Sequence, residues 1–183
     1  MATLERAIEI ARQAHAGQVD KAGADYIEHP LRVMERGENE EQKIVGVLHD
    51  VVEDSDWTFE MLEAEGFSSE VITALKCVTK LSEEEDYDHF IDRVLTNTLA
   101  MRVKLLDLED NMDLTRLSEC TEDDIRRNQK YQLAYDRIKA NIPFAVVRTE
   151  KWTETIGDMT IEHEKSYDVK GRVVGVSKVR YRN

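Results

Sequence analysis

The sequence has no hydrophobic run long enough to cross a membrane. None of its apolar segments approaches the roughly 18 residues that a transmembrane helix needs, and the N-terminus lacks the basic and then apolar pattern of a signal peptide. These absences predict a cytoplasmic protein that neither spans nor binds a membrane.

Cysteine is also scarce. The chain has two, Cys77 and Cys120, and they lie far apart in segments with a helical pattern. This spacing favours free thiols in a reducing compartment over a disulfide.

Positive charge is in deficit. The 25 lysines and arginines are outnumbered by 38 aspartates and glutamates, which gives a formal net charge of -13. Such a charge repels a nucleic-acid backbone and anionic lipid, so we expect no nucleic-acid polymer as a partner unless a local basic patch exists. From Arg148 onward the balance reverses, with 8 basic against 6 acidic residues.

The 183 residues suffice for one domain with a proper core, and they divide by periodicity. Apolar residues recur at helical spacing up to Pro143, and β-branched and aromatic residues alternate after it. The pattern predicts a mainly α-helical bundle over 1–142 with a small antiparallel β appendage over 143–183. The expected helices cover 4–16, a short segment from His29, 40–53, 58–64, 68–79, 84–95, 98–117 and 121–140.

Caps and turns mark the ends of these segments. Thr3, Thr58 and Ser68 are expected N-caps, and Ser82 with Glu85 has the spacing of a capping box. In the appendage the expected strands are 144–148, 159–167 and 172–182, with a turn at 168–171. The exposed last strand could pair with its twin in a homodimer, because an unpaired edge is a template for another strand.

The stretch His49-Asp50-Val51-Val52-Glu53-Asp54 concentrates four ionisable side chains that can bind a metal or activate water. On the expected helix, His49 and Glu53 share a face and Asp50 reaches the same cavity from its edge. A His-Asp pair alone is more often a surface feature. More distant residues therefore decide whether this stretch is a site.

His29 and Asp107 are the distant candidates. Asp107 lies among Leu105, Leu106 and Leu108, where an unpaired buried carboxylate would be costly and a metal would be a partner. Two imidazoles and two carboxylates suit manganese, and iron, zinc and magnesium stay open, with positions left for water and substrate.

The chain also resembles a known family. The segments that carry the resemblance are Gly17-Gln18, Lys21-Ala22-Gly23, Tyr26-Ile27, His29-Pro30-Leu31, the stretch 49–54, Thr79-Lys80, and Lys104-Leu105-Leu106-Asp107 with Asn111. In this order and spacing they resemble the hydrolase domain of RelA/SpoT homologues, HD-superfamily enzymes that degrade the alarmone (p)ppGpp, over residues 4 to about 135.

The resemblance implies a role for each matching residue. His29, His49, Asp50 and Asp107 would hold a divalent metal, typically Mn²⁺, and Glu53 with Asp54 would handle the attacking water. The implied reaction is attack on the phosphorus at the ribose 3′ position, which releases pyrophosphate and leaves GDP or GTP. The small-molecule nucleotide would be contacted by Lys21, Lys104, Asn111, Arg127 and Tyr131.

One departure concerns the nucleobase. Where the family tends to carry a basic pair, this chain has Asp20-Lys21. Aspartate cannot stack on a purine as arginine does, so an HD phosphohydrolase of another nucleotide or phosphate ester is the alternative. A non-catalytic nucleotide-binding module is a third hypothesis, although no ligand and neither acidic residue is missing. The short remainder after the helical body makes an additional synthetase activity unexpected. His15, His89 and His163 are not expected to bind the metal.

Overall fold

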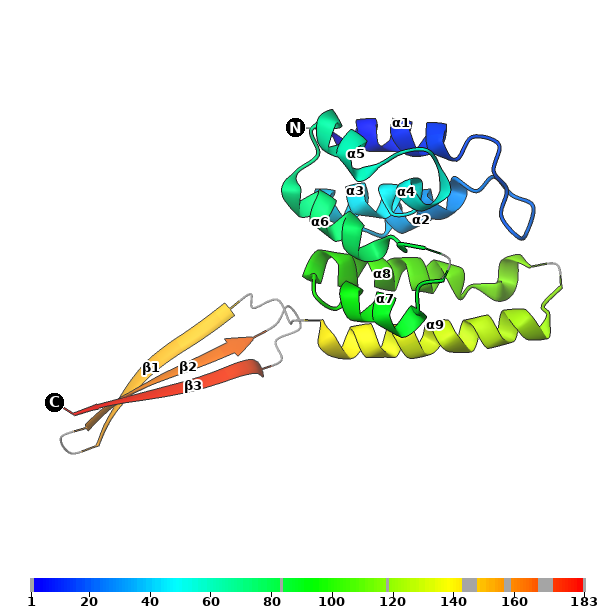
Figure 1. Ribbon diagram of the computed structural model, residues 1–183. Helices are drawn as coiled ribbons and strands as arrows, with labels where there is room; N and C mark the ends of the chain where they lie inside the picture. Colours follow the sequence, from blue (N-terminus) through cyan, green and yellow to red (C-terminus); the bar gives the residue numbers. More distant parts are fainter. Residues whose placement is uncertain are drawn as a thin grey trace. The chain divides into compact units, whose positions relative to one another are not determined.

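The protein consists of a helical part followed by an antiparallel sheet (Figure 1). The computed structural model describes residues 2–82, 84–117, 119–142, 148–156, 159–167 and 173–182. The chain divides into two compact units, Met1–Ile142 and Pro143–Asn183. The predicted fold class, mainly α-helical with an antiparallel β-sheet after the helices, is confirmed.

The regular secondary structure described in the first unit is helical, apart from an isolated β-bridge between Val19 and Asp25. Its helices are α1 (Leu4–Ala14), α2 (Glu28–Glu35), α3 (Glu40–Leu48), α4 (Val51–Asp54), α5 (Phe59–Glu65), α6 (Ser69–Val78), α7 (Tyr87–Val94), α8 (Thr98–Asn111) and α9 (Glu122–Asn141), with a 3₁₀ helix at Leu114–Arg116.

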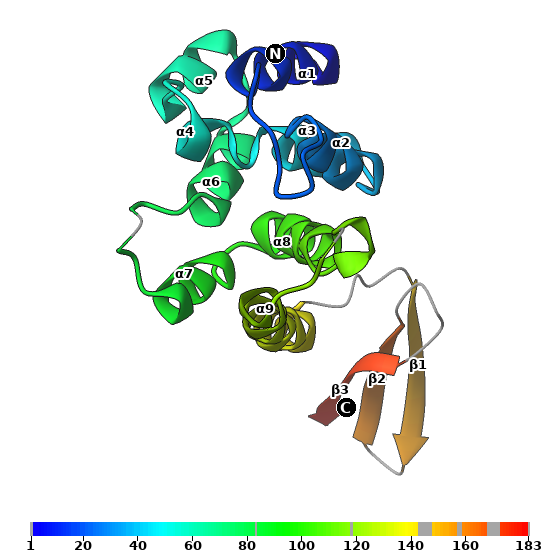
Figure 2. The ribbon, with the colours of Figure 1, turned by 90° about the vertical axis from the view of Figure 1, so that its right-hand side faces the viewer.

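Helix α3 lies at the centre of this unit. It packs against α1, α2, α6 and α8 (Figure 2). Its residues Ile44, Val45, Val47 and Leu48 are buried. Gly46 faces α2 so closely that an added Cβ would lie 3.2 Å from the Cα atom of Met34. The absence of a side chain at Gly46 therefore lets α2 and α3 approach each other.

Most predicted helix starts are confirmed. The side chains of Thr3, Thr58 and Ser68 each accept a hydrogen bond from a backbone N–H in the first turn of the helix that follows. The capping box at Ser82 is wrong. Helix α7 starts later, because the Asp86 carboxylate accepts the N–H groups at the beginning of that helix.

The single helix predicted over 40–53 is also wrong. Helix α3 ends at Leu48 and α4 begins at Val51, which leaves His49 and Asp50 between them. The His49 Nδ1 atom lies 2.7 Å from the Gly46 carbonyl oxygen, so the imidazole takes an acceptor that continued helix would use. This break changes how the two residues are presented.

The helix predicted over 98–117 is shorter than expected. Helix α8 ends at Asn111, and the chain continues in the 3₁₀ helix Leu114–Arg116. The Asp113 carboxylate caps that short helix by accepting the N–H of Thr115. A competing N-cap thus replaces the last turns of the predicted helix.

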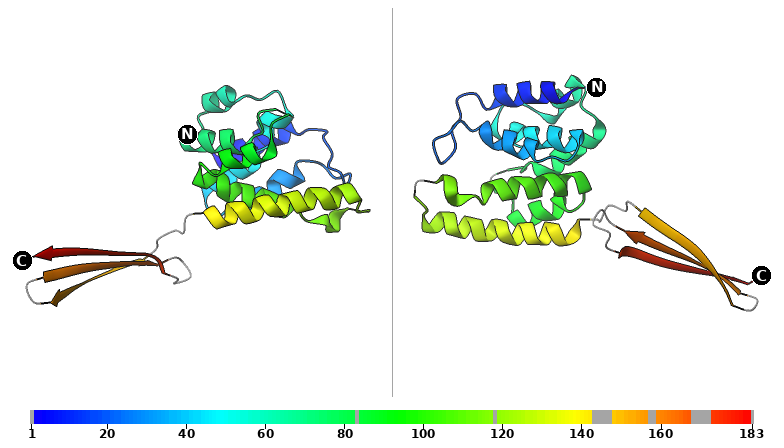
Figure 3. Two further views of the ribbon diagram at one scale, coloured as in Figure 1. Left: turned by 60° about the horizontal axis from the view of Figure 1, so that its bottom comes forward. Right: turned by 180° about the vertical axis from the view of Figure 1, so that it is seen from behind.

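The second unit contains a three-stranded antiparallel sheet in the order β1 (Arg148–Ile156), β2 (Met159–Tyr167), β3 (Val173–Arg182). Both views in Figure 3 show β2 between the other two strands. The prediction for β2 is confirmed, and β3 agrees from Val173 onward. The strand predicted over 144–148 can be compared only at Arg148, where β1 begins. The prediction missed the rest of β1 up to Ile156, because its polar alternation of Thr, Glu and Lys does not form an apolar run. Residues 144–147, Arg172 and the turn at 168–171 lie outside the described residues.

Both cysteines are free thiols, as predicted, with Cys77 buried and Cys120 exposed. Within the described ranges, every helix is too short or too polar to span a lipid bilayer.

Candidate functional site

Three segments of the helical unit bring His29, His49, Asp50 and Asp107 together. His29 comes from α2, His49 and Asp50 from the break between α3 and α4, and Asp107 from α8. The Nε2 atom of His29 lies 3.1 Å from Asp107 Oδ1, and that of His49 lies 3.1 Å from Asp50 Oδ2. The cross distances are 3.7 Å from His29 Nε2 to Asp50 and 3.5 Å from His49 Nε2 to Asp107. We call these four residues the inner cluster.

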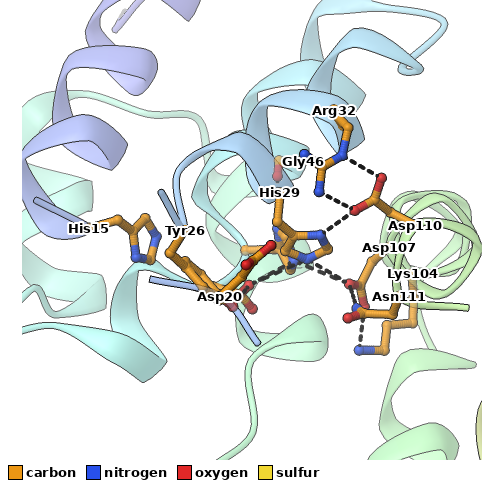
Figure 4. A network of polar contacts seen from close by, with 12 residues as sticks. His15, Asp20, Tyr26, His29, Arg32, Gly46, Lys104, Asp107, Asp110 and Asn111 are labelled. Atoms are coloured by element: carbon orange, nitrogen blue, oxygen red, sulfur yellow. Dashed lines mark hydrogen bonds and ion pairs between the residues drawn. The ribbon is translucent and has the colours of Figure 1, made fainter. Parts of the chain in front are cut away.

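Both imidazoles are oriented by their other ring nitrogen. His29 Nδ1 lies 2.8 Å from Asp110 Oδ2, and His49 Nδ1 lies 2.7 Å from the Gly46 carbonyl oxygen (Figure 4). These acceptors hold the proton on Nδ1 and leave Nε2 as the nitrogen that faces the carboxylates. The His49 Nε2 atom is buried and makes no hydrogen bond of good geometry, although Asp50 Oδ2 lies 3.1 Å away. A buried imidazole nitrogen that faces two carboxylates without a good hydrogen bond fits a metal ligand.

The electrostatics of the inner cluster favour a bound cation. Burial raises the pKa of Asp107, but the adjacent Lys104 ammonium and the two imidazoles outweigh it, so the pKa falls well below its usual range. Burial likewise opposes ionisation of Asp50, and the His49 charge overcomes it and lowers the pKa of Asp50. Burial lowers the pKa of His49, but the Asp50 and Asp107 carboxylates raise it by more, so the pKa is raised overall. Two anionic carboxylates therefore share a largely buried space, where positive charge is strongly stabilised.

A second ring of contacts supports the inner cluster, and the sequence did not reveal it. Asp110 is 1% exposed, accepts two hydrogen bonds from Arg32 at 2.8 and 2.9 Å, and also meets Arg116 at 3.3 Å. Tyr26 donates its hydroxyl hydrogen to Asp50 over 2.7 Å. The available signal for Asp110 was its position three residues after Asp107, on the same side of α8.

Two cavities of about 250 and 240 Å³ meet at this cluster. Tyr26, His29 and Asn111 line both. The first cavity continues past Asp20, Lys21 and Arg116, and the second contains Asp50, Asp107 and three lysines, namely Lys80, Lys104 and Lys130. The inner cluster therefore lies where the two cavities join.

The acidic pair predicted to handle water is divided by the structure. Glu53 lines the second cavity, and its Oε2 atom accepts the backbone N–H of Lys80 at 2.9 Å. Desolvation raises the pKa of Glu53, and the Asp50 charge adds to the rise. Asp54 lines neither of the two cavities, although desolvation and the nearby Asp50 charge also raise its pKa. Of the two, Glu53 is thus the carboxylate that lines a cavity together with Asp50 and Asp107.

The five predicted substrate contacts line these cavities. Asn111 lines both and donates to Asp107 Oδ1, and Lys104 lies 2.7 Å from Asp107 Oδ2. Tyr131 joins Lys104 in the second cavity, whereas Lys21 and Arg127 line the first. Both of these cations pair with Asp124, at 3.8 and 3.2 Å.

Asp20 has a structural task in the first cavity. Its Oδ1 atom accepts the N–H groups of Ala22 and Ala24 at 2.8 and 2.9 Å, which closes the loop before α2. Its Oδ2 atom lies 3.6 Å from Arg116 Nη1. The guanidinium that Asp20 contacts in this cavity thus comes from the 3₁₀ helix Leu114–Arg116.

The other histidines of the first unit, His15 and His89, are not part of the inner cluster, and His163 belongs to the sheet of the second unit. His15 ends α1 as predicted, and its Nδ1 lies 2.8 Å from Gln18 Oε1. His89 is exposed on α7, and His163 stacks on Trp152 in the sheet with 4.8 Å between ring centroids.

Comparison with known proteins agrees with this geometry. A guanosine-3′,5′-bis(diphosphate) 3′-pyrophosphohydrolase of Aquifex aeolicus is 35% identical over 118 residues, which cover 60% of this chain and 17% of that protein. One of the same name from Haemophilus influenzae is 28% identical over 92% of this chain and 26% of its own length. The resemblance to the RelA/SpoT hydrolases is confirmed. The chain spans only about a fifth to a quarter of these relatives, and others are named GTP pyrophosphokinase.

A solved structure shares the fold. It is described as a metazoan ortholog of SpoT that hydrolyses ppGpp, and it matches with a TM-score of 0.65 and 23% identity over 78% of this chain and 88% of that one. No protein-family model matches the sequence.

Proposed function

We propose that residues 1–142 form an HD-type hydrolase domain that removes pyrophosphate from the 3′ position of (p)ppGpp, and that 143–183 are an extension of it. Water would attack the phosphorus attached to the ribose 3′ oxygen. The bond between this phosphorus and the ribose 3′ oxygen breaks, and the 3′ oxygen gains a proton. The products are pyrophosphate and GDP or GTP. The relatives named for this reaction support the substrate.

His29, His49, Asp50 and Asp107 would hold the divalent metal. Their two nitrogen and two oxygen donors suit Mn²⁺, and the buried Nε2 atom of His49, which faces Asp50 and Asp107 without a hydrogen bond of good geometry, is the observation that best fits a bound ion. When bound, such an ion lowers the pKa of water and neutralises phosphate oxygens. Asp110 and Gly46 would keep both imidazoles in the tautomer that binds it.

The chain supplies the proton transfer and the binding of charge. Glu53 would accept a proton from the attacking water, because its raised pKa and its bond from the Lys80 N–H hold it ready beside the inner cluster. Asp54, whose pKa is also raised by desolvation and by the Asp50 charge, would assist Glu53 in handling the attacking water. Lys104 and Tyr131 would bind phosphate in the second cavity, and Lys21, Asn111 and Arg127 would bind the nucleotide in the first.

One observation carries the proposal: a buried His and Asp cluster with an unsatisfied nitrogen opens into a lysine-lined cavity that also contains Glu53. Manganese-loaded protein should release pyrophosphate from ppGpp. Asp50→Ala should lose both the metal and turnover, whereas Glu53→Ala should keep the metal and lose turnover. Metal content and pyrophosphate release measured on the same samples separate the two roles. Loaded protein that releases no pyrophosphate from ppGpp or from its adenosine analogue would refute the assignment.

A second candidate is an HD phosphohydrolase of another nucleotide. Asp20 favours it, because both its oxygens are engaged by the loop and by Arg116 and neither can stack on a base. A panel of nucleotides assayed for pyrophosphate and for orthophosphate distinguishes the candidates, since it reports the base and the bond together. A non-catalytic nucleotide-binding module would bind the panel without turnover.

The proposal also includes a cytoplasmic location and a homodimer. Two free thiols suit a cytoplasmic protein. Strand β3 is at an edge of the described sheet, so pairing with the same strand of a second copy would give a homodimer. Light scattering on the full chain tests the dimer.

A further inference from the structure

A cation and a hydroxyl of the second cavity have no assigned role. Lys130, on α9, and Tyr87, at the start of α7, both line this cavity together with Asp50 and Glu53. The Lys130 ammonium lies 4.4 Å from the centroid of the Tyr87 ring and 5.6 Å from that of Tyr131. Two aromatic rings therefore hold it in place.

The surroundings of Lys130 are positive. Burial lowers the pKa of Lys130, and the neighbouring charges that lower it further are Lys80, Arg127 and Lys104. Lys104 differs, because its ammonium pairs with Asp107 and that carboxylate outweighs burial and raises the pKa. Several cations thus converge at Lys130 with no carboxylate among the charges that shift it, which favours an anion.

The Tyr87 hydroxyl gives an independent sign of a ligand. It is buried and has no hydrogen-bond partner among the described residues. An unsatisfied buried hydroxyl is costly, and a phosphate oxygen would accept its hydrogen. The donor and the cation that lies over its ring face the same cavity.

The contacts also give these groups an order. Lys104 is bound directly to the inner cluster through Asp107, and the Asp50 charge also affects it. Lys130 has no described ion pair with the inner cluster and lies instead over the Tyr87 and Tyr131 rings, so we place it farther out in the cavity than Lys104. A phosphate at the inner cluster would meet Lys104, and a second phosphate joined to it would extend toward Lys130 and Tyr87.

We propose that Lys130 and the Tyr87 hydroxyl bind the outer phosphate of the leaving pyrophosphate, so that the second cavity selects a diphosphate over a single phosphate at the bond that is cut. The inference rests on the proposed function for its substrate. It adds two residues that set which leaving group is accepted.

The test measures binding of inorganic pyrophosphate and of inorganic phosphate to the full chain. Binding is measured by calorimetry in one buffer with the same excess of manganese. Every variant then meets the same complex of manganese with the anion. Lys130→Gln should weaken pyrophosphate binding about tenfold and Tyr87→Phe about threefold, as expected for one charged and one neutral hydrogen bond. Neither should change phosphate binding by more than about twofold.

Matched controls come from the same helix. Lys139 lies 5.0 Å from the Tyr135 ring centroid, away from both cavities, so Lys139→Gln and Tyr135→Phe remove the same groups elsewhere. Equal effects of the cavity and control variants on pyrophosphate, or equal losses for phosphate and pyrophosphate, would overturn the inference. Protein that binds pyrophosphate as described but does not cleave ppGpp would refute the proposed function alone.

Discussion

The inner cluster and the outer parts of the two cavities differ in how their charges are held. His29, His49 and Asp107 are at most 6% exposed, and each is fixed by a second protein group. The side chain of Lys21 is 68% exposed, and its one described ion pair is long, at 3.8 Å. Positions close to the reaction are therefore determined by the fold, whereas the outer cations can adjust to what they bind.

This difference predicts the largest effect at Asp110, which supports the inner cluster without belonging to it. Asp110→Ala would leave Arg32, Arg116 and the His29 N–H without their buried carboxylate, so we expect a loss of about 3–5 kcal/mol in the free energy of unfolding. Manganese affinity should fall by about 10- to 100-fold, since His29 loses its orienting partner.

Denaturant unfolding and metal titration check both effects. Glu109→Ala is the matched control, because this neighbouring carboxylate is exposed and bonds only the Tyr135 hydroxyl among described groups. A loss for Asp110→Ala no larger than for Glu109→Ala would show that the inner cluster does not depend on this support.

Gly46 tests whether the approach of two helices sets the geometry of the inner cluster. In Gly46→Ala the added Cβ would lie 3.2 Å from the Met34 Cα and N atoms, which are backbone and cannot rotate away. We expect a net loss of about 1–2 kcal/mol despite the better helix propensity of alanine, with weaker manganese binding as α2 moves His29.

Thermal unfolding and metal titration measure the outcome. Glu41→Ala, at an exposed position of the same helix, receives alanine without crowding and should change neither. A stabilised Gly46→Ala protein with unchanged metal affinity would contradict the role of this close contact.

The sequence predicted the inner cluster better than the contacts around it. Spacing and resemblance were enough to name His29, His49, Asp50 and Asp107, because few residue types can bind a metal at a buried position. The break between α3 and α4 could not, since it depends on the His49 ring taking the Gly46 carbonyl in space. Asp110 and Tyr26 were missed because their partners lie 81 and 24 residues away in the sequence. Strand β1 was missed because it is polar and only its pairing with β2 defines it.

Asp20 lies on the outer side of the comparison and should affect binding more than chemistry. Asp20→Ala removes the acceptor for the N–H groups of Ala22 and Ala24 and the partner of Arg116. We expect KM for the nucleotide to rise about fivefold with kcat nearly unchanged, which corresponds to the loss of one or two exposed hydrogen bonds.

Asp20→Asn separates the two tasks of this side chain. Its amide oxygen can still close the loop, so KM should stay within about twofold of the wild type. Steady-state kinetics on guanosine and adenosine substrates give both values. If Asp20→Ala lowers kcat instead, Asp20 acts on the inner cluster rather than on the nucleotide.

The smallest effect is expected at Arg36, which shares Asp110 with Arg32 but from the solvent side. Arg36 Nη2 lies 3.5 Å from Asp110 Oδ1, and the Arg36 side chain is 42% exposed. Arg32 Nε lies closer to the same oxygen, at 2.8 Å, and the Arg32 side chain is 30% exposed. Arg36→Gln should change the free energy of unfolding by less than about 0.5 kcal/mol, because water and the remaining guanidiniums screen the lost pair. Denaturant unfolding beside Asp110→Ala places both ends of one ion-pair network on a single scale. An Arg36→Gln loss as large as that of Asp110→Ala would mean that distance from solvent does not decide which charges the fold depends on.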